Sequence, residues 1–309
     1  MEAPGLRPLG VGEILDVAFK IYTRHAVQLF KIVLFVVLPI QVLGGVILLS
    51  TVDDPDAVSG LGEIDTQNDT ELAGAIAGTV VTNLLGALAV LLATAACVKA
   101  VADAYLKSQP DWRESLRAAR GRLGSLLWLS FLYVLLLIPA FVALIIPGIW
   151  LSVAWTVAYP VLMLEGIRGR KALGRSFRLV RGRWWPTFGA LVISYLLAGV
   201  LQALVGAIAA GALIVGVEDS LVGTVLTTGT ANTVAGVLAT PFQAAVAALI
   251  YFDLRVRKEG LDIELLAENV GVAPPDGPAL GHEPPPPPRP VTGDPGLPAA
   301  GPEAVRPPE

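Results

Sequence analysis

Charged residues, cysteine and histidine are scarce in this chain of 309 residues. Only 16% of the residues are charged, whereas a soluble domain carries about a quarter. The single cysteine, Cys97, excludes a disulfide framework, a redox pair and a thiolate zinc cluster, and its position in an apolar run predicts a buried, inert thiol. His282 lies near the C-terminus, and His25 aligns with repeated arginines described below, so we expect neither to act as a catalytic base.

Sequence motifs of catalysis are also missing. The chain has no Gly-rich phosphate loop, no HExxH and no GxSxG nucleophile elbow, so we expect no catalytic site, no cofactor and no metal. The acidic segment 51–71 lacks the EF-hand spacing, which favours a solvated loop and leaves a cation site as an open alternative. A net charge of −4 argues against a nucleic-acid partner.

Long apolar stretches are what the chain has instead, with 54% apolar residues and a mean hydropathy of +0.67. Six of them carry no Asp, Glu, Lys or Arg and suit a hydrocarbon core about 30 Å thick. They are Ile32–Ser50, Leu72–Val98, Leu123–Ile146, Gly148–Leu164, Pro186–Val215 and Thr224–Phe252. Because they are apolar on every face, they predict helices and not strands of a β-barrel.

The fold class that follows is an all-α integral membrane protein with six transmembrane helices arranged as three hairpins. Ile146-Pro147-Gly148 is the predicted tight reversal within the second hairpin. All 22 Lys and Arg residues lie on one side of this predicted arrangement, and the charged residues of the opposite loops are all acidic. The positive-inside rule therefore predicts that both termini are cytoplasmic. We expect a plasma-membrane location and a first span that serves as its own insertion signal.

Three basic segments on that side resemble one another. Ser115–Arg122 reads SLRAARGR, Ser176–Arg183 reads SFRLVRGR, and Ala18–His25 is a fainter copy, AFKIYTRH. Their apolar residues follow i, i+4, i+7, i+11, which predicts amphipathic helices lying on the membrane surface. The repeats divide a membrane domain, residues 1–268, into units 12–98, 110–164 and 171–252, each an interfacial helix followed by a hairpin, with an exit helix at 253–268.

The C-terminal segment 269–309 is predicted to be a disordered, Pro-rich cytoplasmic tail. Gly271–Glu309 contains 14 prolines and no aromatic residue, a composition that cannot bury enough apolar surface to fold. The run EPPPPPRP (Glu283–Pro290) is a possible docking site for a protein partner, although an extended linker is the favoured interpretation.

Three sets of residues are candidate contacts with lipid or a partner. The basic set attracts anionic headgroups at about 1 kcal/mol per residue, the aromatic set suits the membrane interface, and the polar set lies within the spans. The basic set is Arg117, Arg120, Arg122, Arg178, Arg181, Arg183, Arg255 and Arg257. The aromatic set is Trp112, Trp184, Trp185 and Tyr251, and the polar set is Gln41, Asn83, Gln202, Asn232 and Gln243.

Acidic residues stand where three of the spans leave the membrane, at Asp103, Glu165 and Asp253. We expect these exit acids to pair with arginines of the repeats and so to fasten the interfacial helices to the bundle. The arginines expected as partners are Arg117, Arg120, Arg178 and Arg181.

Two functions are compatible with these patterns. The favoured one is a non-enzymatic scaffold or accessory protein that engages anionic lipid or a protein partner at the cytoplasmic face, for which ordinary anchoring charge is the simpler reading of the arginines. The alternative is a permease or lipid-translocating protein with a polar path lined by Asn83, Asn232 and Gln243. The spans contain no ionisable Asp, Glu, Lys or Arg, which argues against an ion-coupled pump.

The two ends of the membrane domain resemble a known family. RPLGVGEILDVAFKIYTRH (Arg7–His25) and YFDLRVRKEGLDIELL (Tyr251–Leu266) are similar to the ends of actinobacterial multi-pass proteins labelled after the membrane domain of glycerophosphoryl diester phosphodiesterases. The resemblance implies a membrane-embedded helical domain over about residues 7 to 268. It implies no catalytic residue, because the phosphodiesterase domain with its His-Arg and Glu-x-Asp motifs is absent.

Overall fold

The computed structural model describes residues 7–51, 69–106, 109–214 and 221–261, and in these ranges it contains helices and turns but no strand. The predicted tail and most of the acidic segment lie outside them. The helices are α1 (Val11–Arg24), α2 (Ala26–Thr51), α4 (Asp69–Leu106), α5 (Trp112–Gly121), α6 (Leu123–Ala143), α7 (Ile145–Ala154), α8 (Ala158–Pro160), the π-helical turn η1 (Val161–Glu165), α9 (Arg170–Val180), α10 (Trp184–Ile214) and α11 (Leu221–Glu259).

Six stretches of helix in the described residues are long and apolar enough to cross a membrane. They are Ala26–Ser50, Ile76–Leu106, Leu123–Val142, Ile145–Glu165, Trp184–Gly211 and Val222–Glu259. The prediction of an all-α chain with six apolar helices is therefore confirmed, and the composition is that of a multi-pass membrane protein.

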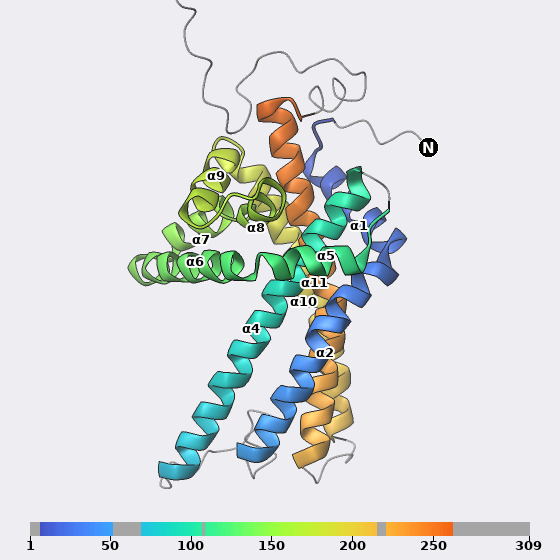
Figure 1. The fold of residues 1–309 in the computed structure, drawn as a ribbon, viewed down its shortest axis with the longest axis vertical. Helices are drawn as coiled ribbons and strands as arrows, with labels where there is room; N and C mark the ends of the chain where they lie inside the picture. The colour runs from blue at the N-terminus through green and yellow to red at the C-terminus, as the bar shows by residue number, and fades with distance from the viewer. Residues whose placement is uncertain (1–6, 52–68, 107–108, 215–220, 262–309) are drawn as a thin grey trace, which may run out of the picture. The chain divides into compact units, whose positions relative to one another are not determined.

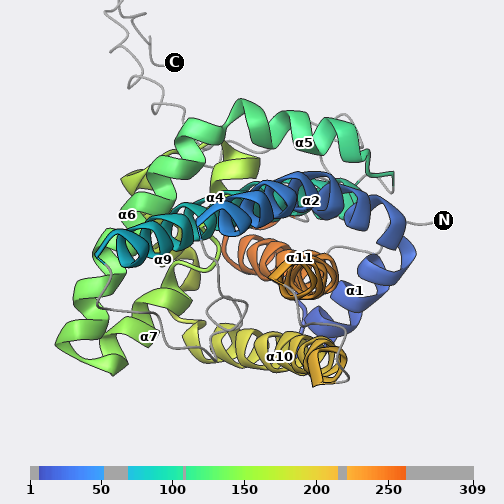
Figure 2. The same ribbon diagram turned by 90° about the horizontal axis from the view of Figure 1, so that it is seen from below.

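Helix α11 lies at the centre of the helix packing and contacts α2, α4 and α10 along its length (Figures 1 and 2). Helices α4 and α11 contact each other, and both carry fully buried small residues, among them Ala96, Ala100, Ala245 and Ala248. Small residues let helix backbones approach closely, which is how helices associate where the surroundings are as apolar as the side chains.

The three repeated segments form short helices, α1, α5 and α9, each directly before a long apolar helix. Their equivalent residues Ala18, Ser115 and Ser176 are fully buried, while the residues at the repeated arginine positions 20, 117 and 178 are exposed. Helices α1 and α9 and the last turns of α11 lie at one end of the long helices, and the free ends of α2, α4, α10 and α11 point the other way (Figure 1). The basic residues of α1, α9 and the last turns of α11 are thus at the same end of the long helices.

The reversal between α6 and α7 differs from the prediction. Leu144, with φ −164° and ψ 141°, breaks the helix, whereas Pro147 and Gly148 lie within the first turn of α7, where the N–H that proline lacks has no helical partner to lose. Gly148 allows the two arms to close, because a Cβ there would lie 2.5 Å from the Phe141 ring. Helix α6 runs across the direction of α2 and α4 and contacts chiefly α7 (Figure 1).

Two further boundaries differ from the sequence interpretation. The fourth apolar stretch is not one helix, since α7 ends at Ala154 and the chain continues through turns into α8 and η1. The expected exit helix at 253–268 is not a separate element over its first residues, because α11 continues unbroken to Glu259 and Gly260 follows with φ +63°. Residues 262–268 lie outside the described ranges.

Candidate functional site

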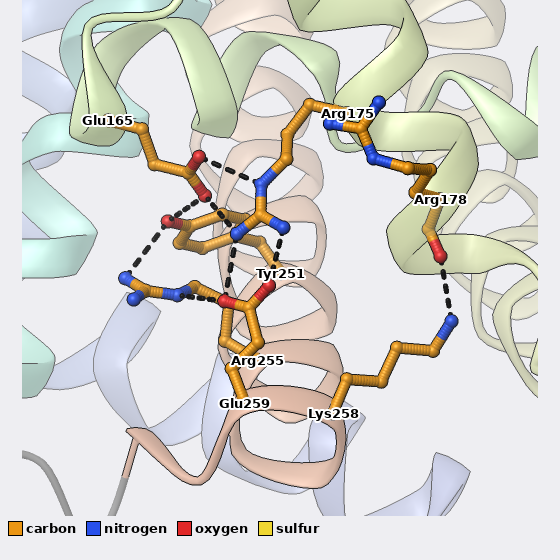
Figure 3. A network of polar contacts seen from close by, with 7 residues as sticks. All are labelled: Glu165, Arg175, Arg178, Tyr251, Arg255, Lys258 and Glu259. Carbon is orange, nitrogen blue, oxygen red and sulfur yellow. Dashed lines mark hydrogen bonds and ion pairs between the residues drawn. The ribbon is translucent and has the colours of Figure 1, made fainter. Parts of the chain in front are cut away.

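A cluster of charged side chains joins α9 to the end of η1 and to the last turns of α11 (Figure 3). Arg175 of α9 is at its centre, with a side chain only 8% exposed. Its Nε donates to Glu165 Oε2 at 2.9 Å, its Nη2 donates to Glu259 Oε2 at 2.8 Å, and its Nη1 donates to Glu259 Oε1. One guanidinium therefore bridges two carboxylates from different elements, the geometry in which arginine binds most strongly.

Arg175 is buried because of its position on α9. It lies three residues after Ala172 and four before Leu179, both of which belong to the buried face of the helix. A cation on such a face has to be paired, since an isolated buried charge is very costly. The carboxylates of Glu259 and Glu165 accept its hydrogen bonds and raise the pKa of Arg175 further above its ordinary value, so the cluster holds a permanent positive charge at its centre.

Tyr251 and Arg255 complete the cluster from α11 (Figure 3). The Tyr251 hydroxyl donates to Glu165 Oε1 at 2.9 Å, and Arg255 Nε donates to Glu259 Oε2 at 3.0 Å. Each carboxylate thus has a second donor besides Arg175. Tyr251 and Arg255 were expected at the lipid interface, but Tyr251 is fully buried and Arg255 is turned inward.

Two basic side chains cap the ends of neighbouring helices. Lys258 Nζ donates to the carbonyl oxygens of Arg178 and Arg181, at 2.7 and 2.6 Å, where α9 ends. Arg122 Nη1 donates to the carbonyl oxygens of Leu162 and Met163 in η1, at 2.6 and 2.7 Å. A cation is favourable at a helix C-terminus, where carbonyl groups lack partners. Arg122, predicted as a lipid contact, therefore serves an internal one.

A second charged group holds the segment that precedes α1. Asp253 Oδ1 accepts the Leu9 amide at 2.7 Å, and Arg257 Nη2 donates to the Leu9 carbonyl at 2.8 Å. Arg257 Nε also donates to the Asp253 carboxylate, at 2.9 and 3.0 Å. Both backbone groups of Leu9 are satisfied by α11, so the carboxylate and the guanidinium clamp the N-terminal segment to the end of that helix. Arg257 was also predicted as a lipid contact.

The exit acids are paired, but not with the arginines expected from the sequence. Asp103 pairs with Lys99 at 2.5 Å, Glu165 with Arg175 and Asp253 with Arg257. The i, i+4 spacing of Lys99 and Asp103, and of Asp253 and Arg257, brings these partners together on one helix face. The expected partners Arg117, Arg120, Arg178 and Arg181 are exposed instead.

Several arginines of α5 and α9 are exposed, and no ion pair joins these exposed arginines to an acid within the described ranges. On α5 the exposed Arg113, Arg117 and Arg120 are spaced i, i+4, i+7 and form one stripe. On α9 and just beyond it, exposed Lys171, Arg178 and Arg181 are spaced i, i+7, i+10 and form another. We call these six residues the basic stripes.

Arg183, which was also predicted as a lipid contact, is half-buried. Its Nε has no hydrogen-bond partner in the described part of the chain, and the side chain lines a cavity of about 10 Å³ beside Leu9 and Asp253. That volume suits about one water molecule.

The predicted interfacial tryptophans lie beside the basic helices. Trp112 begins α5 and carries Arg113 over its ring at 5.2 Å. Trp184 begins α10, stacks on Phe188 with ring centroids 5.0 Å apart, and donates from Nε1 to the Trp150 carbonyl at 3.2 Å. Trp185 is 75% exposed. An exposed tryptophan next to a basic stripe is typical of the headgroup layer.

The predicted polar set does not come together as a path in the described part of the protein. Asn83, Gln202 and Asn232 are exposed on their helices, and Asn83 Nδ2 donates to the Thr79 carbonyl of the preceding turn at 2.9 Å. Gln41 and Gln243 are half-buried. A pocket of about 390 Å³ lies between α10 and α11. It is lined mainly by apolar side chains such as Val205, Ile208 and Leu226, and by none of the predicted polar set.

The described residues contain no group of three or more His, Cys, Asp or Glu side chains that could hold a metal ion. Cys97 is fully buried in α4, as its apolar surroundings predicted.

Sequence reasoning missed Arg175, although a signal for it was present. Among the Lys and Arg residues of α9, Arg175 alone falls in phase with the buried apolar residues, and a cation in that position requires a nearby acid. The two carboxylates that meet it come from residues 10 and 84 positions away, so the pairing itself was not visible in the sequence.

Comparison with known proteins adds one family match. The family model described as "Domain of unknown function (DUF8558)" matches residues 123–274, a range that contains the whole Arg175 cluster. Neither the curated proteins nor the solved structures gave a match to this chain.

Proposed function

We propose that this chain is a non-enzymatic scaffold or accessory protein of the plasma membrane, with both termini in the cytoplasm, and that its basic stripes bind anionic lipid headgroups there. The observation that carries the proposal is that the basic residues fall into an internally bonded set and an exposed set. Those of the cluster and the caps make internal contacts, whereas the stripes on α5 and α9 are exposed and lack acidic partners in the described ranges.

The internal contacts support this role because they hold the stripe on α9 in place. Arg175 anchors α9 to α11 through Glu259, and Lys258 closes its C-terminal end. The helix thus presents Arg178 and Arg181 outward from a fixed position, with Trp184 and Trp185 following directly. Preorganised cations beside interfacial tryptophans suit the phosphate layer of an anionic leaflet, where each basic residue contributes about 1 kcal/mol.

A second candidate is a lipid-translocating protein, and the open apolar pocket between α10 and α11 favours it. A pocket of about 390 Å³ with few polar groups suits an acyl chain better than a polar solute. We further propose the relationship to the membrane domain of glycerophosphoryl diester phosphodiesterases that the terminal motifs suggest, and a protein partner for the Pro-rich tail.

The lipid preference is testable by tryptophan quenching in proteoliposomes. The full-length protein is reconstituted with brominated phosphatidylglycerol or brominated phosphatidylcholine, and the ratio of quenching reports the relative affinity for the anionic lipid. We expect the wild-type protein to prefer phosphatidylglycerol. The variant Arg117→Gln/Arg120→Gln/Arg178→Gln/Arg181→Gln removes four residues at ~1 kcal/mol each, about a thousandfold if all four act fully, so the preference should fall by at least about tenfold even if only part of that attraction is specific to the anionic lipid.

The matched control is Arg289→Gln/Arg306→Gln, which removes charge from the tail and leaves the stripes unchanged. It should keep the preference of the wild-type protein. An unchanged preference in the quadruple variant would exclude the stripes as the headgroup site.

A further inference from the structure

The turn between α6 and α7 exposes several large apolar side chains. Val142, Leu144, Ile145 and Ile146 are 65 to 81% exposed. From Val134 to Leu151 the sequence contains no charged, hydroxyl or amide side chain. A turn that reached the water on the far side of a membrane would be expected to carry polar residues, as the acidic segments between α2 and α4 and between α10 and α11 do.

The depth of α7 follows from its contacts. Trp184, the first residue of α10, directly follows Arg183 and lies three residues after Arg181, so it marks the basic end of that helix. Its Nε1 donates to the Trp150 carbonyl at 3.2 Å, which places Trp150 at the same end. The Trp150 ring also contacts Phe177 of α9, with centroids 5.3 Å apart, and Ser176 Oγ donates to the Ala154 carbonyl at 2.8 Å.

The distance from these contacts to the turn is short. Ile146 precedes Trp150 by four residues of one helix, a rise of about 6 Å at ~1.5 Å per residue. A hydrocarbon core is about 30 Å thick, so a turn this close to the level of α9 and Trp184 does not reach the opposite surface. The whole of α7, 10 residues long, rises only about 15 Å before the chain turns at Trp155.

We propose that α6 and α7 form a non-crossing hairpin, which enters and leaves the membrane on the basic side and buries its tip, Leu144–Ile146, among the acyl chains of that one leaflet. The partner of this surface is the hydrocarbon of the leaflet that α9 rests on. Four helices then cross the membrane, α2, α4, α10 and α11, and the first three of these make the most extensive contacts with α11. The direction of α6 across α2 and α4 is that of a hairpin lying along the leaflet (Figure 1).

This arrangement keeps the predicted sidedness of every charged residue. The turn at 144–148 carries no charge, so the positive residues before α6 and after η1 lie on the same side whether or not the hairpin crosses.

The test uses single cysteines in the full-length protein, on a Cys97→Ser background, with a membrane-impermeant maleimide applied to intact cells and to inverted vesicles. Ser59→Cys, between α2 and α4, and Arg178→Cys, on α9, are the controls for the two sides. We expect each control to react from one side only, and Ile146→Cys to react from neither until the membrane is dissolved. Leu144→Cys serves as a second tip position in case the first variant does not fold.

A distance measurement on the doubly nitroxide-labelled variant Ile146→Cys/Arg178→Cys completes the test. A non-crossing hairpin keeps the two labels well within the thickness of the hydrocarbon core, whereas a crossing hairpin separates them by about 30 Å or more. Labelling of Ile146→Cys from the same side as Ser59→Cys, or a separation of that size, would overturn the inference.

Discussion

Replacing Arg175 by methionine is the most informative change to the charged cluster. Methionine keeps most of the aliphatic length of the side chain but removes the guanidinium that bridges Glu165 and Glu259. Two carboxylates are then left close together, one of them only 7% exposed. Breaking a buried ion pair by removing one partner costs about 3 to 5 kcal/mol, because the remaining charge is uncompensated.

The structure reduces that figure at both carboxylates. Glu165 keeps the Tyr251 hydroxyl and Glu259 keeps Arg255, at 2.9 and 3.0 Å, and a hydrogen bond to a charged group contributes about 1.5 to 3 kcal/mol. We therefore expect Arg175→Met to lower the free energy of unfolding by about 2 to 4 kcal/mol. At roughly 2 to 4 °C per kcal/mol for a protein of this size, the midpoint of thermal unfolding in detergent should fall by about 5 to 15 °C.

Arg178→Met is the control, since Arg178 lies on the same helix, is exposed and has no acidic partner in the described ranges. It should change the free energy of unfolding by less than about 0.5 kcal/mol. The double variant Arg175→Met/Glu165→Gln should regain part of the loss, because it removes one of the uncompensated charges. Equal midpoints for Arg175→Met and Arg178→Met would refute the view that the cluster fastens α9 to α11.

Three further changes test other parts of the structure. Asp253→Asn weakens the clamp on Leu9, so limited proteolysis should cleave near residues 7–10 faster than in the exposed-site control Asp16→Asn, and equal cleavage would count against the clamp. Gly148→Ala places a Cβ 2.5 Å from the Phe141 ring and should lower the free energy of unfolding by about 1 to 3 kcal/mol. The double variant Phe141→Ala/Gly148→Ala should remove the clash, whereas a Gly148→Ala protein with wild-type stability would contradict the close approach. Burial and the nearby Arg24 lower the pKa of His25 from 6.5. The unfolded chain therefore binds this proton more readily, and the free energy of unfolding should fall as the pH drops below about 6.5. The variant His25→Gln should lose less stability than the wild-type protein between about pH 7.5 and 5.5, and identical pH profiles would refute this.

Much of the fold was predictable from the sequence because a bilayer permits few solutions. A run of about 20 apolar residues must satisfy its own backbone hydrogen bonds, so helices were expected in all six apolar stretches. The fourth departs from this, since turns divide it into α7, α8 and η1. The repeats at Ser115 and Ser176 likewise predicted the two short amphipathic helices, since a seam at helical spacing depends on the local sequence alone.

Which charged residues pair with one another was harder to predict than where the helices lie. The sequence showed that acids stand at the ends of the spans and that arginines are near, but the choice of Arg175 over Arg178 for Glu165 depends on which face of α9 is turned inward. The same holds for Tyr251, whose aromatic ring at the end of an apolar run is typical of an interface residue, yet it is buried because α11 is central and surrounded by other helices.

By itself, then, the sequence determined the helical class, the approximate positions of most apolar helices and the alternation of basic and acidic segments between them, because these depend on local hydrophobicity and charge. The tertiary structure alone decided which basic residues face inward, where α6 gives way to α7, and how close the turn between them lies to α9. Those features depend on contacts between residues far apart in the chain, such as Arg175 with Glu259 and Trp150 with Trp184, and neither spacing nor composition encodes such contacts.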